Sequence, residues 1–430
     1  MNKKILKYVS QSVLGMIGVS VYILADTYFI SYGFGADGLT VLNLVLPIYG
    51  LIYAIGQMLG LGFAVSYSLD KGRGESTYGY FLAAIRWCLI MSLPFVLLGA
   101  FLPEQLLGMM GADPVLAEMG KNYVRLIMCG SPLFMMNYVL LAFARNDHAT
   151  GIAMVGALAG SFYNIVFDYV FMFPLGFGFP GAALATVGCP VISMLICLTH
   201  YISPKNTVGM KMENLNPHLL RRSSALGMSG FVGEFSFAVT SLVFNFMTLT
   251  LAGNVGVAAY GVIANIALVC TCIFNGVAQG MQPLISRSYG KGEKAEVASL
   301  LRTGLLIMFV TSALFLLLGI LFAEPMVGIF NSQKDEALAY YAVPGLRLYF
   351  TGFLIAGVNV YLIAYYSATG REKPVMIGSI LRGMVLIAGF AVLFGFLFGM
   401  NGIWLSYLAA EAGTLLVLLM MQRVSRDALK

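Results

Sequence analysis

The sequence predicts an all-α integral membrane protein with 12 transmembrane helices in two six-helix lobes. The first indication is composition, because 59% of the residues are hydrophobic and only 10% are charged, whereas soluble domains carry roughly a quarter charged residues. The second is that the apolar residues form runs of about 20 or more, the length that crosses a hydrocarbon core of about 30 Å. These runs are too long and too little alternating for barrel strands, so helices remain as the spanning structure. The third is that the second half of the chain repeats the first.

The apolar runs are separated by polar residues or by Gly and Pro. The first half contains six of them, near residues 8–31, 41–69, 79–102, 118–142, 151–174 and 180–202. The second half contains six more, near residues 224–250, 255–286, 297–322, 338–366, 375–398 and 401–422. The first run follows a basic start, as in a signal peptide, but it carries Asp26 and lacks a small-residue cleavage site. We therefore expect it to be retained as the first helix.

The two halves match at a nearly constant offset. GADGLTVLNLVLPI from Gly35 resembles GNVGVAAYGVIANI from Gly253, 218 residues later, and GAALAT matches GIWLSY at an offset of 221. Six crossings in each half give both halves the same orientation, so we expect parallel repeats related by an axis along the membrane normal. The predicted division is an N-lobe at 1–202, a cytoplasmic linker at 203–222 and a C-lobe at 223–430.

Basic residues indicate the orientation. If both termini are cytoplasmic, all but four of the 25 Lys and Arg residues lie toward the cytoplasm, and the four exceptions are Lys121, Arg125, Lys334 and Arg347. This distribution follows the positive-inside rule and predicts a multi-pass inner-membrane protein with both termini cytoplasmic. The net charge of +6 is explained by this topology, so we expect no nucleic-acid partner. We expect the chain to function as a monomer among membrane lipids.

Three acidic residues stand out inside the predicted helices, where a charge costs about 2.5–3.5 kcal/mol on the insertion scale. Asp26 lies late in the first helix, Asp168 late in the fifth and Glu234 early in the seventh. Buried carboxylates of this kind are functional candidates, although hydrogen bonding between helices is the alternative role for Asp26 and Asp168. For Glu234 the alternatives are a place in a cavity and a side chain that extends toward water.

Residues around Asp168 predict a cation site. Asn164 lies four residues before Asp168, so the two share one helix face, and Ala182 and Thr186 repeat this spacing on the sixth helix. If the first helix packs beside these two, Asp26 completes a pocket of two carboxylates, one amide oxygen and one hydroxyl. Such hard oxygen ligands suit a small cation, and two neighbouring carboxylates repel each other until Na⁺ or a proton binds.

Further residues inside the spans are candidates for lining a substrate cavity between the lobes. They are Glu234, Asn137, Tyr138, Phe167, Met172, Asn245, Asn265, Gln279, Gln282 and Asn359. Each of the polar ones alone is more often a packing residue. We expect His148, His200 and His218 to be solvated in or near cytoplasmic loops. The sequence contains neither a phosphate-binding loop nor a helical HExxH motif, so we expect no catalytic residues and no cofactor beyond a coupling ion.

Four motifs, in order along nearly the whole chain, resemble the multidrug and toxic compound extrusion (MATE) family. They are LADTYFISYGFGADGL, NIVFDYVFMFPLGFGFPGAALATV, GVAQGMQPLISRSYGKGE and YYSATGREKP. The resemblance implies a V-shaped antiporter without enzymatic activity, in which organic cations or drugs leave while Na⁺ or H⁺ enters, and the lobes alternate between inward-open and outward-open states. It is closest to the bacterial branch related to DNA-damage-inducible exporters.

The resemblance also implies site residues. The cation site of that branch falls on Asp26, Asn164, Asp168, Ala182 and Thr186, with Na⁺ as a possible metal at Asp26, Asn164, Asp168 and Thr186. A carboxylate of the Na⁺-coupled branch resembles Glu234 in GFVGEFSF. The proline that family members often carry early in the first helix is missing from VSQSVLGM, and Asn359 lies near the place of an aspartate found in the C-lobe of some members.

Two alternative functions remain open at this point. One is a flippase for lipids or lipid-linked oligosaccharides of the same superfamily, which is expected to line its cavity with several Arg or Lys residues. The other is an integral-membrane enzyme that modifies lipids, which requires an acidic, His or metal constellation near an interface. We expect an exporter that handles its coupling cation in the N-lobe.

Overall fold

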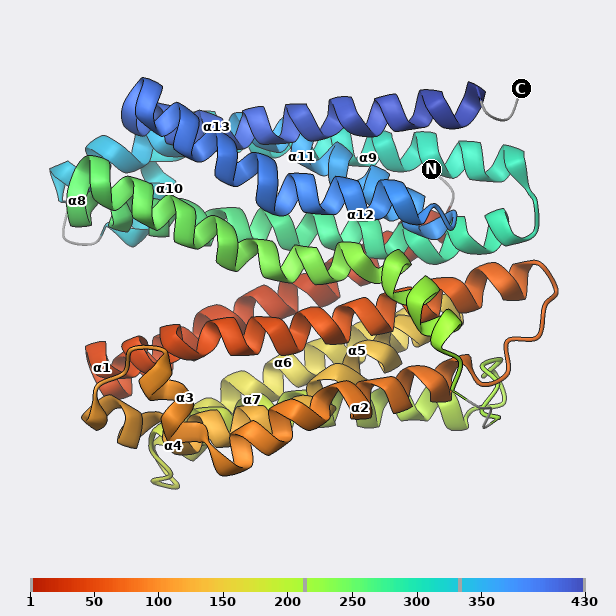
Figure 1. Cartoon of the computed structure of the whole chain (residues 1–430), viewed down its shortest axis with the longest axis horizontal. Helices are drawn as coiled ribbons and strands as arrows, with labels where there is room; N and C mark the ends of the chain where they lie inside the picture. Colours follow the sequence, from red (N-terminus) through yellow and green to blue (C-terminus); the bar gives the residue numbers. More distant parts are fainter. Residues whose placement is uncertain (1–2, 212–214, 332–334, 428–430) are drawn as a thin grey trace.

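The computed structural model describes residues 3–211, 215–331 and 335–427, and within these ranges it consists of helices without strands (Figure 1). Lys334, one of the four basic residues expected on the outer side, lies outside the described residues. The helices are α1 (Lys3–Gly72), α2 (Tyr80–Phe101), α3 (Pro103–Met109), α4 (Pro114–Cys129), α5 (Ser131–Asn146), α6 (Thr150–Met172), α7 (Phe179–Ile202), α8 (Pro217–Gly290), α9 (Lys294–Leu321), α10 (Ala323–Phe330), α11 (Glu336–Ala368), α12 (Glu372–Ile380), the π-helical turn η1 (Leu381–Val385) and α13 (Leu386–Asp427).

Glycines divide three of these helices into separate crossings. Gly35 in α1, Gly253 in α8 and Gly399 in α13 have positive φ angles of 57°, 62° and 60°, a conformation that glycine adopts without steric cost. In the described part of the chain, nine helices are long and apolar enough to cross a membrane, or ten if the pair α4 and α5, bent by 41°, forms one crossing. Two of the nine, Pro217–Gly290 and Glu372–Gln422, contain Gly253 and Gly399. With α4 and α5 counted as one crossing, dividing these two helices at their glycines gives the twelve predicted crossings.

The internal repeat is visible in the backbone. Gly35 and Gly253, 218 residues apart, have similar ψ angles of −141° and −152° as well as similar φ angles. Gly178 and Gly399, 221 residues apart, share φ angles near 60° and the same ψ of −142°. These offsets are those of the sequence matches, so each half makes the same turns at the same places. The predicted fold class of two parallel six-helix lobes is confirmed.

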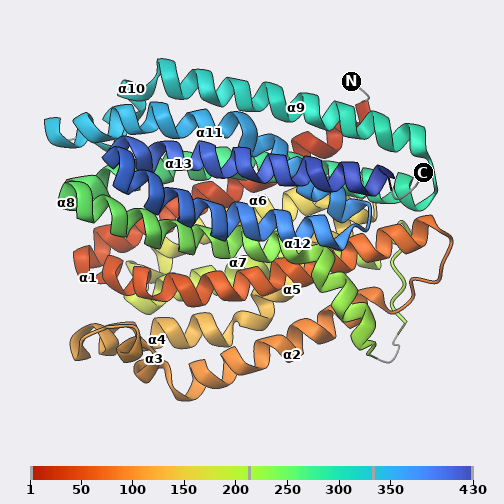
Figure 2. The same cartoon turned by 45° about the horizontal axis from the view of Figure 1, so that its top comes forward.

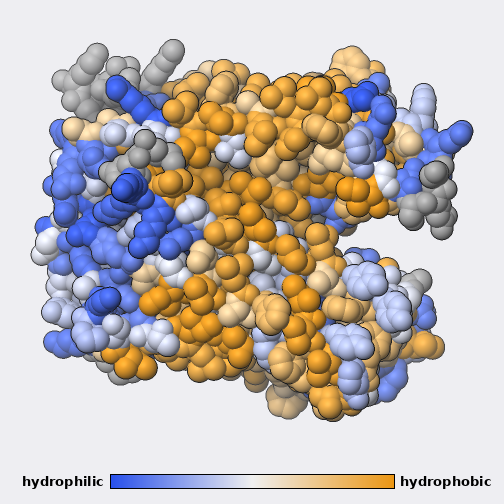
Figure 3. Space-filling model, turned by 180° about the vertical axis from the view of Figure 1, so that it is seen from behind, coloured by the Kyte–Doolittle hydropathy of each residue, from blue (hydrophilic) through white to orange (hydrophobic). Residues whose placement is uncertain are grey.

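The two lobes lie side by side and separate at one end. In Figures 1 and 2, α1 to α7 form one bundle and α8 to α13 form the other. Figure 3 shows an apolar belt, a hydrophilic end, and a deep notch between the lobes at the opposite end. We call the hydrophilic end, which carries the loops 73–79 and 291–293, the terminal end, because the start of α1 and the end of α13 lie toward it (Figure 1). Helix α8 already begins at Pro217, inside the predicted linker 203–222.

Small residues bring the lobes into close contact toward the terminal end. A Cβ atom at Gly62 of α1 would lie 1.9 Å from the carbonyl oxygen of Ser223, and one at Gly227 of α8 would lie 2.0 Å from that of Met58. Closer to the terminal end, the Oγ atoms of Ser68 and Ser286 are 2.9 Å apart. Ser68 and Ser286 occupy equivalent positions in the two repeats, at the offset of 218, so the axis that relates the lobes passes near them. We use the name inter-lobe seam for the surface along which α8 contacts the N-lobe, namely α1 and the turn between α5 and α6.

The start of α1 crosses the seam. Ile5, Tyr8 and Val9 belong to the apolar core of the C-lobe, and a Cβ atom at Gly280 of α8 would lie 2.8 Å from the carbonyl oxygen of Tyr8. Further along α1, a Cβ atom at Gly18 would lie 2.7 Å from Leu158 Cδ2 of α6. The first crossing therefore contacts the C-lobe with its beginning and the N-lobe with its middle.

Replacing Gly227 by alanine is expected to weaken the seam. The added methyl group collides with the backbone of Met58, which cannot move without shifting α1. The matched control is Gly233→Ala on the same helix, where nothing lies within 4 Å of the new Cβ atom; this change is expected to be neutral or to stabilise by about 0.5–1 kcal/mol. Spin-label distances across the terminal end and the midpoint of thermal unfolding measure the difference. Equal behaviour of the two variants would contradict the role of the seam.

Candidate functional site

The N-lobe brings the five predicted cation-site residues to neighbouring helices. Asp26 lies on α1, Asn164 and Asp168 lie on α6, and Ala182 and Thr186 lie on α7. Close packing aligns these helices, because a Cβ atom at Gly181 of α7 would lie 2.8 Å from the backbone of Phe171 at the end of α6, and α1 packs on α6 at Gly18. The predicted cation site requires the first crossing (α1) to lie beside the fifth (α6) and the sixth (α7). The structure shows α1 packed on α6.

The oxygen atoms of this cluster are buried and lack partners. Asn164 and Asp168 are 0% exposed. Both carboxylate oxygens of Asp168, Oδ1 of Asp26 and Oδ1 of Asn164 have no hydrogen-bond partner. The amide nitrogen of Asn164 donates to Oγ1 of Thr186 over 3.4 Å, which turns the amide oxygen away from the hydroxyl. Unpaired buried oxygens are rare and require an explanation. Their chemistry fits a hard monovalent cation or a proton.

Glu234 lies at the seam. Its Oε1 accepts a hydrogen bond of 2.7 Å from Nε2 of Gln57, so α8 and α1 are joined across the two lobes at this point. Gln57 is about 15 residues, or roughly 22 Å along the helix, from the terminal end of α1, which places the contact deep within the bundle. The sequence did not indicate Gln57, because a contact across 177 residues leaves no local signal.

Aromatic side chains gather on the N-lobe one and two helical turns from Gln57. Tyr49 donates to the hydroxyl of Tyr53 over 2.5 Å, and the ring of Tyr53 meets that of Tyr138 on α5 edge to face at 5.3 Å. The ring of Phe134 lies 5.4 Å from those of Tyr49 and Tyr53. Tyr49, Tyr53 and Gln57 are four residues apart in turn, so one face of α1 carries all three. Of this cluster, the sequence had indicated only Tyr138.

The other predicted cavity residues do not converge on one place. Gln279 of α8 accepts a hydrogen bond from Arg145 of α5 across the seam. Gln282 is buried in the C-lobe and donates to Ser367 of α11. The remaining side chains are placed as follows: Asn137 on α5 with a buried unpartnered Oδ1, Phe167 stacked on Tyr163 along α6, Met172 buried against α1, and Asn245 and Asn265 hydrogen-bonded within α8.

The C-lobe contains a buried ion pair that sequence reasoning missed. Nε of Arg382, in the π-turn η1, lies 2.7 Å from Oε1 of Glu411 of α13. Nδ2 of Asn359 donates over 2.7 Å to Oε2 of the same carboxylate and over 2.8 Å to its backbone oxygen. The side chain of Glu411 is 1% exposed and that of Arg382 is 21% exposed. Arg382, one of the basic residues that the sequence assigned to the cytoplasmic side, lies within the C-lobe and not in a loop.

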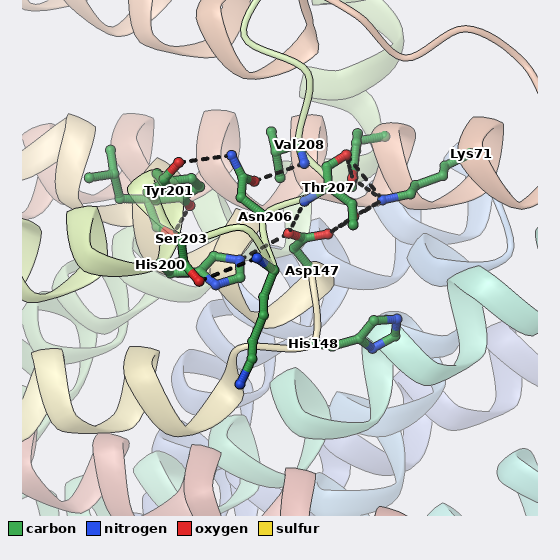
Figure 4. A network of polar contacts seen from close by, with 12 residues as sticks. Lys71, Asp147, His148, His200, Tyr201, Ser203, Asn206, Thr207 and Val208 are labelled. Carbon is green, nitrogen blue, oxygen red and sulfur yellow. Dashed lines mark hydrogen bonds and ion pairs between the residues drawn. The ribbon is translucent and has the colours of Figure 1, made fainter.

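A second polar network ties the chain together at the terminal end (Figure 4). The carboxylate of Asp147, after α5, accepts hydrogen bonds from the backbone of Thr207 over 2.8 Å and from Nε2 of His200 over 2.9 Å. Nζ of Lys71 lies 3.4 Å from it. Burial alone would raise the pKa of Asp147, but the hydrogen bonds and Lys71 hold it below its usual range. His200 is 4% exposed, so the expectation that it is solvated is wrong, whereas His218 is exposed as expected.

His148 joins this network to the seam. Its Nε2 faces the guanidinium of Arg287 of α8, and its Nδ1 lies 2.6 Å from the hydroxyl of Tyr8. Arginine only donates, so Nε2 must be the unprotonated nitrogen and Nδ1–H donates to Tyr8. His148 is exposed, as expected from the sequence, but partial burial of its ring, together with the charges of Arg287 and Lys4, lowers its pKa from the ordinary 6.5 to about 4. Its neutral form therefore makes both contacts.

The chain resembles known proteins along most of its length. The model of the family described as MatE matches residues 12–170 and 231–393. The multidrug export protein MepA of Staphylococcus saprophyticus is 26% identical over 423 residues, which cover 96% of this chain and 93% of that protein. MepA of Staphylococcus aureus strain MRSA252 is 25% identical over 424 residues, covering 97% and 92%. A structure of a multidrug resistance MATE family transporter in an outward-facing conformation superposes with a TM-score of 0.90 at 22% identity, covering 99% and 96% of the two chains.

Acid is expected to loosen the seam through His148. Because its pKa is depressed in the folded state, its contribution to stability is complete above pH 6.5 and is lost as the pH falls toward about 4. His148→Gln keeps one acceptor and one donor but does not titrate. The cross-seam spin-label distance is expected to change between about pH 7 and about pH 5 in the native chain but not in this variant. His218→Gln, at a histidine that contacts neither Arg287 nor Tyr8, serves as the control, and a pH response unchanged in His148→Gln would refute the assignment.

Proposed function

Because this chain belongs to the MatE family, whose curated relatives are multidrug export proteins, we propose that it is a secondary antiporter that exports organic cations or drugs in exchange for Na⁺ or H⁺. The observation that carries this proposal is the group of buried, unpartnered oxygens on Asp26, Asn164 and Asp168. Two buried carboxylates without partners are stabilised when a cation or a proton binds to them, and an ion gradient across the membrane supplies such a cation or proton. The protein is a transporter and not an enzyme.

In the proposed mechanism, a cation enters from outside and neutralises Asp26 and Asp168. The repulsion between the two carboxylates is relieved, so α1 and α6 approach and α1 changes its position. Residues Asn164 and Thr186 would supply the neutral oxygen ligands of Na⁺, and Ala182 leaves the space beside them. A proton would instead bind to one carboxylate. The family's early helix proline is missing from this chain, so the movement is assigned to α1 as a whole.

Helix α1 links the proposed cation site to the seam. Asp26 and Tyr8 lie 18 residues apart on it, about 27 Å along the axis. A shift of α1 at Asp26 would act on the contacts of Tyr8 with His148 and with the C-lobe core. Release of these contacts would open the terminal end while the notch closes, which is alternating access by rigid lobes.

We place the terminal end in the cytoplasm of a bacterial inner membrane. The basic residues near this end, including Lys3, Lys4, Arg287, Lys291 and Lys294, follow the positive-inside rule. The notch of Figure 3 then faces outward. We propose that the chain works as a monomer surrounded by lipid.

The aromatic cluster and Glu234 suggest where an organic cation is held. Aromatic faces attract cations when water is excluded. Tyr53 and Tyr49 lie one and two helical turns from Gln57 on the same face of α1, and the ring of Tyr138 contacts that of Tyr53. A carboxylate beside three tyrosines selects for flat, positively charged ligands. The coupling ion itself is to be identified by efflux from proteoliposomes under separately imposed Na⁺ and pH gradients.

Neutralising the N-lobe carboxylates is expected to abolish coupling. In Asp26→Asn and Asp168→Asn the site no longer gains from binding a cation, so gradient-driven efflux of a fluorescent organic cation from proteoliposomes falls at least about tenfold. Asp37→Asn, at an exposed aspartate of the same helix α1, controls for the exchange and is expected to remain active. Full gradient-driven efflux by either of the first two variants would exclude the mechanism.

Glu234→Gln is expected to reduce affinity for charged substrates selectively. The amide retains a hydrogen bond with Gln57 but removes the negative charge, so the Kd of a monovalent organic cation rises roughly tenfold, equivalent to about 1.4 kcal/mol. The Kd of an uncharged analogue of the same shape should not change. Gln57→Leu removes the hydrogen bond and keeps the charge, and serves as the comparison. A loss of affinity equal for both ligands would point to a packing role for Glu234.

A further inference from the structure

The two lobes treat their buried carboxylates differently. In the N-lobe, Asp26 and Asp168 form no ion pair among the residues that the structure describes, and three of their oxygens have no partner. In the C-lobe, Glu411 has Arg382 at 2.7 Å and Asn359 at 2.7 Å. The charge of Glu411 is therefore matched by a cation that belongs to the chain itself.

The backbone around Arg382 departs from a regular helix. Residues Leu381–Val385 form a π-turn, a rare element that is frequent at functional sites and that shifts the following residues around the helix axis. Gly383 within this turn allows a close approach to α8, since a Cβ atom there would lie 2.7 Å from that of Ser236. The turn thus interrupts the crossing at the residue that carries the guanidinium.

Stability alone does not account for this pair. Removing two charges from water costs several kcal/mol each, and a buried ion pair is often no more stable than apolar residues of the same volume. Charged residues inside a membrane protein are functional candidates for that reason. Besides Arg382 and Asn359, the groups near Glu411 are the hydroxyls of Tyr407 and Tyr349, and neither offers a second positive charge.

We infer that Arg382 is a tethered counter-ion that takes the place of a mobile cation at the buried carboxylate of Glu411 in the C-lobe. The inference rests on the proposed antiport function. Glu411 is a buried carboxylate like those that the N-lobe offers to a mobile cation, and the amide nitrogen of Asn359 donates to its Oε2 atom. In the C-lobe the guanidinium fills this place permanently, so the C-lobe takes up no Na⁺ or H⁺ and coupling is confined to the N-lobe. Arg382 thereby sets the number of ions exchanged in each cycle.

The inference is tested by counting bound cations. The full chain in detergent is titrated with radioactive Na⁺ and, in weakly buffered solution, with acid. The double variant Asp26→Asn/Asp168→Asn is expected to lose cation binding, because Glu411 is already matched. Addition of Arg382→Gln to this background should restore about one bound cation per chain, and further addition of Glu411→Gln should abolish it. Arg382→Lys, which keeps the charge, should restore none.

The outcomes separate this inference from the proposed function. If the double N-lobe variant still binds a cation and Glu411→Gln removes that binding, Glu411 is an open site and the inference is overturned. If binding persists regardless of Glu411→Gln, the N-lobe assignment fails; Arg382→Gln in the native background then decides, and the lack of an added cation overturns the inference. Should Arg382→Gln alone fail to fold, folding of the Arg382→Gln/Glu411→Gln pair supports the counter-ion role. Failure of both overturns it.

Discussion

The structure depends on one constraint: every charged side chain inside the apolar belt needs a counter-ion or a hydrogen-bond partner beside it. A bilayer offers no water for this purpose, so the compensating group is either part of the chain or arrives from solution. Glu411 has its compensation in Arg382, and Glu234 is hydrogen-bonded by Gln57. Asp26 and Asp168 have neither. Glu411 thus has a counter-ion, Glu234 has a neutral hydrogen-bond donor, and the carboxylates of Asp26 and Asp168 have neither kind of partner.

Close packing gives this division mechanical consequences. The seam is held by backbone contacts at Gly62 and Gly227, by paired serines near the axis of the repeat, and by the start of α1 in the core of the C-lobe. Contacts of this kind do not stretch gradually, because a small displacement removes them. A seam of rigid backbones is compatible with the two discrete lobe arrangements of the proposed alternating access. The charged network around Asp147 joins the ends of α1, α5 and α7 to one another beside the seam.

The sequence predicted those features that repeat or run continuously. The twelve crossings, the parallel repeat and its offset, and the family resemblance follow from patterns spread over tens of residues, and the matching turns at Gly35 and Gly253 confirm them. The cation site remains a prediction, although its residues lie on packed helices. Its spacing was readable because Asn164 and Asp168 share one helix face, with Ala182 and Thr186 placed likewise on the next crossing.

Features made by distant contacts were not readable. Glu411 and Arg382 are isolated charged residues within apolar runs, and no sequence pattern near either residue indicates that it contacts the other, 29 positions away. The π-turn that carries Arg382 leaves no recognisable signal in LRGMV. The sequence placed His200 near a solvated loop. In the structure, the segment after α7 folds back, and the backbone of Thr207 and the ring of His200 both contact the carboxylate of Asp147. Linear position therefore indicates depth in the membrane better than it indicates what a side chain faces.

The difference between the lobes explains why a repeated fold benefits from unequal halves. Two equivalent mobile-cation sites would respond to the same gradient and bias both lobes at once, whereas one site leaves the other lobe as a fixed reference. The repeat supplies matching backbones, and the charges then distinguish them: carboxylate oxygens without partners on α1 and α6, and in the C-lobe a carboxylate whose Oε1 lies 2.7 Å from Nε of a guanidinium. Because α1 packs on α6 and begins in the C-lobe core, the proposed mechanism would transmit a change at the N-lobe carboxylates through α1 to the C-lobe.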